Sequence, residues 1–340
     1  VQQENFDLSL KEKEVPSGAN YYFGHGKVLL TGEYTILEGA KAIALPTKPG
    51  QSMKVTYQRS YDPKLYWKSI DLSGKSWFEC TFEFWNFDIV SDHKTKEALF
   101  LQRLLREIRA QNTHFLREEQ DIHVETFLGF PREWGLGSSS TLIYNLAQWG
   151  YVSPFELLYK TSMGSGYDVA CAQSEGPILF KKESEGPIYS PVIFDPPFKE
   201  NLYFIYLGKK QNTEEEIIKF KNLAKKDTKE VTSKVSLITD KILACNSLEE
   251  FSHLISEHEK IMSSFLGKKT LKEKHFIDFR GEVKSLGAWG GDFALACSTD
   301  SKEKVKNYFD KKGFSVCLDY SDLILENNFL NSEMSERVLH

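Results

Sequence analysis

A glycine- and serine-rich segment, PREWGLGSSST at residues 131–141, is the feature that most constrains how this chain can fold. An alternating apolar pattern over residues 122–128 predicts a strand before it, and an apolar stripe with helical spacing predicts a helix that begins within Ser138–Thr141. Gly135 and Gly137 would let backbone N–H groups turn toward one point, and a helix N-terminus adds unpaired donors and a positive dipole end. The segment is therefore a candidate phosphate-binding loop. A serine-capped helix after a tight turn is the plainer alternative.

Composition places the chain among soluble globular proteins, with 340 residues that are 41% hydrophobic and 27% charged. This length favours two domains, because a single core stops growing at roughly 250–300 residues. A net charge of −5 argues against a nucleic-acid surface. The longest apolar runs, such as Leu202–Leu207, fall far short of the ~20 residues of a membrane helix, so no membrane partner is expected.

Residues 1–20 are polar and lack the apolar stretch of a secretory signal, so we expect a tail or an arm there. The five cysteines are scattered and never spaced CxxC. They are expected to be buried thiols in a reducing compartment, the cytoplasm.

The periodicity of the remaining sequence predicts a mixed α+β chain in two halves, without internal repeats. Turns are expected at Leu45–Pro46 and Pro49–Gly50, hairpins within residues 59–93, and a linker within residues 183–197. The segment 293–318 reads as a strand–helix–strand crossover. Further strands are predicted at residues 27–31, 53–57, 178–180 and 202–207, and helices at 96–110, 214–226, 231–245 and 248–265.

The common nucleotide-binding and hydrolase motifs are missing: the sequence has no Walker A loop, GxGxxG, HExxH, kinase HRD or GxSxG. Two further glycine-rich segments remain. GHGKVLLTGEY at residues 24–34 puts Lys27 at the mouth of a buried strand, although most lysines are solvated surface residues. KSLGAWGGDF at residues 284–293 precedes a strand, and its glycines permit either close approach of a ligand or a tight β turn.

Taken together and in this order, the three segments resemble the GHMP kinase superfamily, which includes galactokinase, homoserine kinase, mevalonate kinase and phosphomevalonate kinase. They resemble its PGKxxLxGEH/Y opening, its PxxxGLGSSAA loop and its GAGGGG loop. GSGYDVAC at residues 164–171 and the GGD ending at Asp292 are similar to the mevalonate and phosphomevalonate kinase branch. The resemblance implies an α+β, two-domain fold: a ribosomal S5 domain 2-like, ATP-binding domain at 21–190 and a ferredoxin-like domain at 191–340.

The resemblance also implies roles for individual residues. Asp168 would be the general base on an acceptor hydroxyl, with Lys27 beside it to keep the carboxylate ionised. Ser139, or Ser138 as the second choice, would supply the hydroxyl that touches Mg²⁺. The residues expected around ATP are Trp134, Gly135, Leu136, Gly137, Ser138, Ser139, Ser140, Gly290 and Gly291. Those expected around the acceptor are Glu33, Tyr34, Gly166, Tyr167, Lys209, Thr213, Gly287, Ala288 and Asp292.

Several positions depart from the family pattern. His25 replaces a proline, and Trp134 and Trp289 replace small residues, where they could either stack on an adenine or pack within the protein. Mevalonate kinases carry a glutamate eleven residues before the base as a second magnesium ligand. Leu157 occupies that position here, with Glu156 one step out of register. The metal would then be held by fewer protein groups or by another acid.

The predicted reaction is transfer of the ATP γ-phosphoryl group to mevalonate or phosphomevalonate by a monomer or homodimer. Lys209, Lys210 and Thr213 could contact an acceptor carboxylate or phosphate, or Thr213 could simply cap a helix. A GHMP kinase acting on homoserine or a sugar is one alternative. A catalytically silent binding protein of the same fold is another; the missing glutamate favours it, and the retained Lys27 and Asp168 oppose it.

Overall fold

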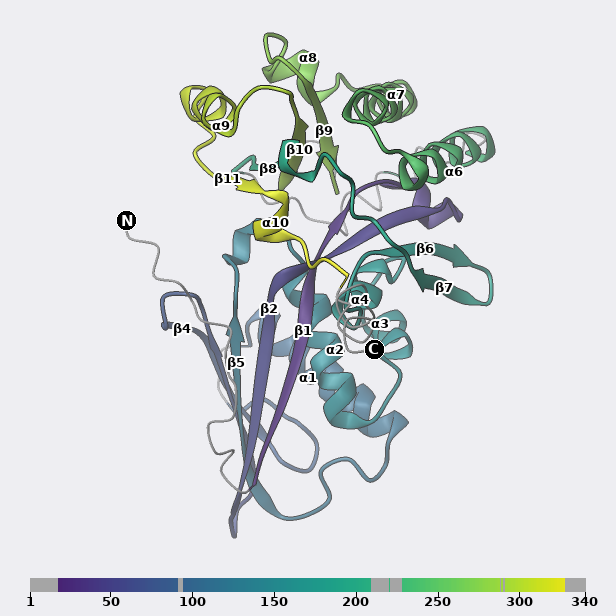
Figure 1. Cartoon of the computed structure of the whole chain (residues 1–340). Helices are drawn as coiled ribbons and strands as arrows, with labels where there is room; N and C mark the ends of the chain where they lie inside the picture. Colours follow the sequence, from purple (N-terminus) through teal and green to yellow (C-terminus); the bar gives the residue numbers. More distant parts are fainter. Residues whose placement is uncertain are drawn as a thin grey trace, which may run out of the picture.

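The structure is a computed structural model that describes residues 18–90, 94–208, 220, 228–287, 289 and 291–327. Its strands form two β-sheets, a long one in the lower part of Figure 1 and a shorter one above it. The long sheet has the order β4-β3-β5-β2-β6-β7, and β1 pairs with β2. Neighbouring strands are antiparallel except β3 and β5. The strands are β1 (Ala19–Leu29), β2 (Ala42–Arg59), β3 (Lys64–Ile70), β4 (Ser76–Glu83), β5 (Gln120–Leu128), β6 (Ile178–Glu183) and β7 (Gly186–Pro191).

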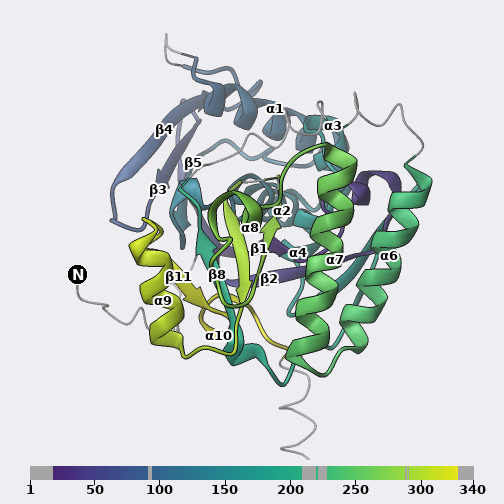
Figure 2. The same ribbon diagram turned by 90° about the horizontal axis from the view of Figure 1, so that it is seen from above.

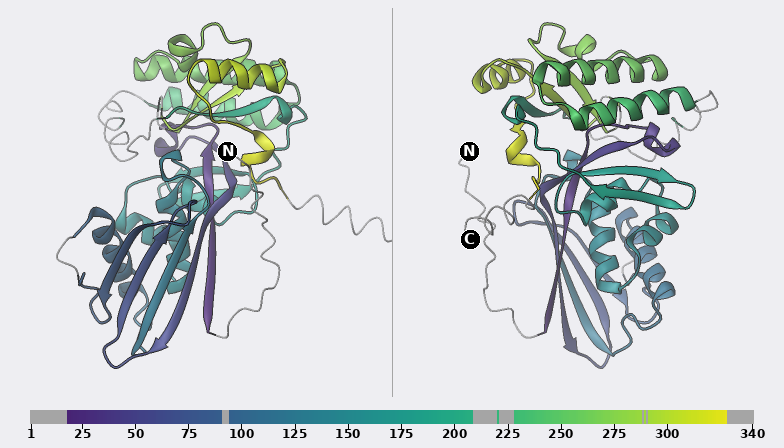
Figure 3. Two further views of the ribbon diagram at one scale, coloured as in Figure 1. Left: turned by 90° about the vertical axis from the view of Figure 1, so that its left-hand side faces the viewer. Right: turned by 45° about the vertical axis from the view of Figure 1, so that its right-hand side comes forward.

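Helices cover one face of the long sheet (Figure 3). They are α1 (Lys96–Gln111), α2 (Ser138–Gly150), α3 (Pro154–Thr161) and α4 (Tyr167–Ala172). The Thr95 side chain caps α1 by accepting a hydrogen bond from the Ala98 N–H, and the apolar stripe of α1 is buried against the sheet. Along β5, Ile122 and Val124 alternate with more exposed residues and pack into this core.

The shorter sheet has the order β11-β8-β10-β9, so its strands lie fourth, first, third and second. Two long helices separate its first two strands, and a third crosses from β10 to β11, giving the β-α-β-β-α-β sequence of a ferredoxin-like unit. Figure 2 shows these helices from above. The elements are β8 (Leu202–Tyr206), α6 (Lys229–Ala244), α7 (Leu248–Leu266), α8 (Leu271–His275), β9 (Glu282–Leu286), β10 (Phe293–Cys297), α9 (Lys302–Lys311), β11 (Cys317–Asp319) and α10 (Tyr320–Leu323).

A continuous apolar core joins the two sheets. On one face of β8, Leu202 and Phe204 pack in a cluster that includes Val28 and Leu45 of the long sheet. Residues of the opposite face of β8 pack with α8 and α9 instead. The chain also returns to the long sheet after α10, where the Leu325 N–H donates to the Pro46 carbonyl at 2.9 Å.

Two sequence predictions are wrong. The expected turns at Leu45–Pro46 and Pro49–Gly50 lie inside the single strand β2. The pairing of β1 with β2 jumps from His25–Gly50 to Gly26–Thr47, and this bulge accommodates Pro49, which has no N–H to give the ladder. The expected linker at residues 183–197 contains β7, which pairs with β6.

Most other element predictions are confirmed within a few residues, including α1, α2, α6, α7, the β3–β4 hairpin and the β10–α9–β11 crossover. The helix expected at residues 214–226 lies outside the described residues. All five cysteines are free thiols, four of them buried and Cys317 partly so. Within the described ranges, no helix combines the length and apolarity that crossing a membrane would require.

Candidate functional site

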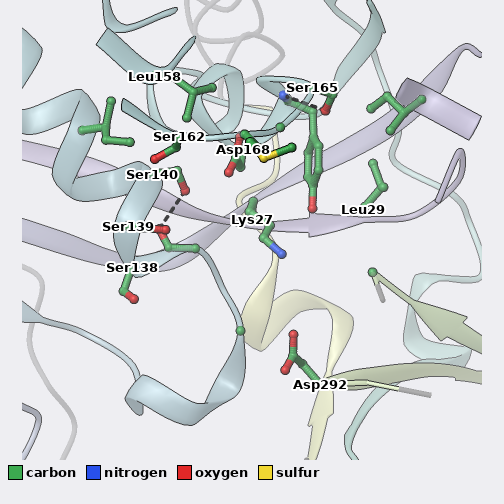
Figure 4. Close-up of a pocket in the computed structure, with 18 of the residues that line it drawn as sticks. Lys27, Leu29, Ser138, Ser139, Ser140, Leu158, Ser162, Ser165, Asp168 and Asp292 are labelled. Atoms are coloured by element: carbon green, nitrogen blue, oxygen red, sulfur yellow. Dashed lines mark hydrogen bonds between the residues drawn. The ribbon is translucent and has the colours of Figure 1, made fainter. Parts of the chain in front are cut away.

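A cavity of about 280 Å³ opens where five separate segments of the chain meet. Its wall is formed by residues 27–37, by Phe100 of α1, by the loop at residues 131–141 (the glycine–serine loop) with the start of α2, by the α3–α4 connection and by the β9–β10 loop. Figure 4 shows the polar side chains that point into it. The predicted site residues among its lining are Lys27, Glu33, Tyr34, Gly135, Gly137, Ser138, Ser139, Ser140, Tyr167, Asp168, Gly287 and Asp292.

The glycine–serine loop leads directly into α2. Gly137 is the N-cap residue of α2 with φ 93°, and no side chain caps the helix. Ser138, Ser139 and Ser140 all line the cavity, and the Ser140 hydroxyl donates to the Gly137 carbonyl at 2.8 Å. An uncapped helix N-terminus and two hydroxyl groups facing one cavity can bind an anion such as phosphate.

Two contacts hold this loop against its neighbours. The backbone N–H of Lys27 donates to the Leu136 carbonyl at 2.9 Å, which joins β1 to the loop. Gly135 has φ 65°, and a Cβ atom there would overlap the Asp292 carboxylate. A Cβ atom at Gly137 would come within 2.7 Å of the Ser140 hydroxyl. Both glycines are therefore required by backbone conformation and by space.

Lys27 lies between two carboxylates, Asp168 on one side and Asp292 on the other (Figure 4). Its ammonium also lies 5.7 Å from the centre of the Tyr167 ring. Burial opposes the charged form and is the largest single influence, but the Tyr167 hydroxyl and the two carboxylates together outweigh it and raise the pKa of Lys27. Lys27 is therefore a fixed positive charge inside the cavity.

Asp168 lies in the first turn of α4, directly after the turn formed by Gly166 with φ 96°. One carboxylate oxygen accepts a hydrogen bond from the Val169 N–H at 3.0 Å. Burial raises the pKa of Asp168, and the charge of Lys27 offsets part of that increase. A half-buried carboxylate that faces a cavity and has a raised pKa has the properties of a general base.

Glu33 and Tyr34 connect the cavity to the shorter sheet. Glu33 is 3% exposed, and its carboxylate forms an ion pair with Lys284 of β9, whose side chain is 0% exposed. His258 of α7 lies 3.3 Å from the other Glu33 oxygen. The Tyr34 hydroxyl accepts a hydrogen bond from the Trp289 N–H at 2.7 Å. Glu33 therefore has a structural partner as well as a place in the cavity wall.

The two tryptophans that depart from the family pattern do not line the cavity. Trp289 is 7% exposed, and its indole N–H donates to the Lys269 carbonyl at 3.2 Å. Trp134 packs at ring-centroid distances of 5.6 Å from Phe293 and 6.1 Å from Tyr206. These contacts support packing within the protein, and not stacking on an adenine, for both tryptophans.

The remaining predicted residues fall into two groups. Leu136, Gly166 and Gly291 are described but lie outside the cavity lining; Leu136 is part of the core between the sheets. Lys209, Thr213, Ala288 and Gly290 lie outside the described residues.

Sequence reasoning missed several residues of the cavity wall: Phe100, Arg132, Ser162, Met163 and Ser165. Arg132 stacks at 3.6 Å from the centre of the Trp77 ring and lies 3.6 Å from the Glu97 carboxylate. Its position within the glycine–serine segment was a signal, because a cation near such a loop suits phosphate. Ser165 is the middle residue of the GSG motif at residues 164–166, whereas Ser162 precedes the motif and follows no pattern of its own.

Magnesium was expected at Ser139. No group of three or more His, Cys, Asp or Glu side chains suited to a metal ion occurs in the described part of the chain. Leu157 is buried and Glu156 is not among the cavity residues, so neither supplies a ligand in this arrangement. The Ser139 hydroxyl and the Asp292 carboxylate do face the cavity. Hard oxygen donors of this kind fit Mg²⁺, which takes one or two protein oxygens and completes its shell with phosphate and water.

The two sheets and their helices form the fold seen in solved GHMP kinase structures, as the sequence predicts. Mevalonate kinase from Methanococcus jannaschii is similar over 92% of this chain and 100% of its own, with a TM-score of 0.67 and 15% identity. Phosphomevalonate kinase from Streptococcus pneumoniae is similar over 88% and 99%, with a TM-score of 0.65 and 16% identity. Galactokinase from Lactococcus lactis is similar over 87% and 89%, with a TM-score of 0.60 and 13% identity. No protein-family model and no curated protein sequence matches the chain.

Proposed function

We propose that this protein is an ATP-dependent kinase that transfers the γ-phosphoryl group of ATP to a small acceptor, either to the hydroxyl group of mevalonate or to the phosphate group of phosphomevalonate. One observation carries the proposal: Lys27 and Asp168 face the same cavity as the N-terminus of α2. Phosphoryl transfer depends mainly on positioning and charge neutralisation, and these groups supply both.

In this mechanism the Gly135–Ser140 loop holds the triphosphate, and the dipole of α2 stabilises its charge. Asp168 accepts the proton of the acceptor hydroxyl as the oxygen attacks the γ-phosphorus, and the bond from that phosphorus to the β–γ bridging oxygen breaks so that ADP leaves. Lys27 keeps that carboxylate ionised and stabilises negative charge that develops on the transferring group. Ser139 would hold Mg²⁺, which neutralises phosphate charge when bound.

The acceptor would lie on the far side of Asp168 from the loop. Tyr34, Tyr167 and Gly287 are the described candidates for its contacts, and the Lys209–Thr213 segment remains a proposed contributor. We also propose domain limits of 21–190 and 191–340. The five free thiols support a reducing compartment, for which the cytoplasm is our proposal.

Structures of this fold have been solved with different acceptors. L. major mevalonate kinase was solved in complex with R-mevalonate, S. pneumoniae phosphomevalonate kinase with phosphomevalonate and AMPPNP, and L. lactis galactokinase with galactose. A coupled assay of ADP release over mevalonate, phosphomevalonate, homoserine and galactose would identify the acceptor class. If no acceptor supports turnover while calorimetry shows no heat with Mg-ATP, the protein is a silent member of the fold.

Asp168→Asn tests the assigned base. We expect turnover to fall by about 10²- to 10⁴-fold, because the amide cannot accept the proton, while Mg-ATP affinity and the circular dichroism spectrum stay unchanged. Glu156→Gln is the matched control, since it removes a carboxylate from the neighbouring helix α3 outside the cavity lining. Full turnover by the Asp168→Asn protein would refute the assignment.

A further inference from the structure

Asp292 occupies an unusual place for a negative charge. It lies at the end of the β9–β10 loop, and its carboxylate rests against Gly135 of the glycine–serine loop. On the other side it lies close enough to Lys27 to raise the pKa of that ammonium group. The carboxylate therefore sits beside the loop that, in the proposed function, receives a triphosphate.

The positive charges that line the cavity are too few to neutralise both its carboxylates and the phosphates of a nucleotide. Among its described lining residues, Lys27 is cationic and Asp168 and Asp292 are anionic, while Glu33 is already paired with Lys284 and Arg132 with Glu97. One ammonium group thus faces two carboxylates before any phosphate enters. A triphosphate placed against Asp292 would be repelled unless a further cation came with it.

We propose that Asp292, together with Ser139, is a ligand of the divalent cation that accompanies the nucleotide. This inference rests on the proposed kinase function and deepens it. Both groups are hard oxygen donors that face one cavity, and Mg²⁺ is commonly held by one carboxylate together with phosphate oxygens and water. The ion would convert the repulsion between Asp292 and the phosphates into attraction.

The proposal predicts that Asp292→Asn changes AMPPNP affinity in opposite directions with and without the metal ion. Asp292→Asn should weaken binding of AMPPNP in the presence of Mg²⁺ by about 10- to 100-fold, because a charged ligand of the ion is lost. The same variant should bind AMPPNP more tightly than the wild type in the presence of EDTA, because a repulsive charge is removed. Isothermal titration calorimetry measures both affinities on the full chain, and Mn²⁺ electron paramagnetic resonance reports the ion directly.

Glu133→Gln is the matched control, because it removes one charge next to the same loop from an exposed residue that does not line the cavity. It should change neither affinity appreciably. Asp292→Ser serves as a second variant if the asparagine protein does not fold. A wild type that binds AMPPNP, combined with an Asp292→Asn protein whose two affinities are unchanged or move in the same direction, would overturn the proposal. A wild type that binds the nucleotide in neither condition would instead overturn the kinase function, and this inference with it.

Discussion

The buried ion pair between Glu33 and Lys284 offers the sharpest test of how the two sheets are held together. Lys284 is 0% exposed and donates to Glu33 and, at 2.9 Å, to the Ser285 carbonyl. Lys284→Met keeps most of the side-chain volume but removes the ammonium group. The variant therefore isolates the charge interaction from the packing.

The expected loss of unfolding free energy comes from the Glu33 carboxylate that Lys284→Met leaves unpaired. Glu33 would be left as a buried carboxylate without its cation, and breaking such a pair from one side costs about 3–5 kcal/mol of unfolding free energy. Burial already raises the pKa of Glu33 and Lys284 lowers it, so the variant should shift that pKa further up and allow Glu33 to take up a proton. The double variant Glu33→Gln, Lys284→Met should recover much of the loss, because neither charge then needs a partner.

Equilibrium unfolding in urea measures these free energies. Lys304→Met is the control, since that lysine is 70% exposed and its nearest carboxylate lies 3.9 Å away. It should change stability by no more than about 0.5 kcal/mol. A Lys284→Met protein within about 1 kcal/mol of the wild type, or a double variant as unstable as the single one, would refute the reasoning.

Two further predictions concern the glycine–serine loop and the buried acid beside the ion pair. Gly135→Ala should lower stability by about 1–2 kcal/mol and weaken nucleotide binding. Alanine is strained at the left-handed φ of this position, and its Cβ atom would overlap the Asp292 carboxylate. Gly74→Ala, at φ 77° with nothing within 4 Å, separates the two effects because it should cost conformational energy alone and leave nucleotide titrations unchanged. Burial raises the pKa of Glu259 to about 8, so the folded protein keeps a proton that the unfolded chain releases, and stability falls as the pH rises from the ordinary glutamate range toward 8. Glu259→Gln should reduce the slope of unfolding free energy against pH by up to about 1.4 kcal/mol per pH unit, as measured by urea unfolding at pH 5 to 8. An unchanged slope would contradict the raised pKa of Glu259.

Local patterns in the sequence predicted the parts of the site that one segment can form alone. The loop before α2 needed left-handed glycines and a helix N-terminus, and both are visible in residues 131–141. The turn before α4 is local as well, since Gly166 precedes Asp168 by two residues. The fold class followed because these motifs occur in a fixed order along the chain.

Contacts between distant segments could not be predicted in the same way. Lys284 and Glu33 are 251 positions apart, and a lone lysine in a strand has no feature that marks it as buried. The course of β2 through Pro46 and Pro49 depends on a bulge in its pairing with β1, so the prolines alone suggested turns. The packing of Trp289 likewise depends on Tyr34 and Lys269, which lie on other elements.

The return of the chain to the long sheet after α10 limits how the two sheets can move. Leu325 is hydrogen-bonded to Pro46, and Ile324 forms a bridge with Thr47, so the last described segment is attached to β2 close to where Lys27 pairs with Pro46. A rigid displacement of one sheet relative to the other must either break these bonds or rotate about them. Hinge-like opening would therefore pivot near Lys27, and the mouth of the cavity could widen while Lys27 itself stayed almost still.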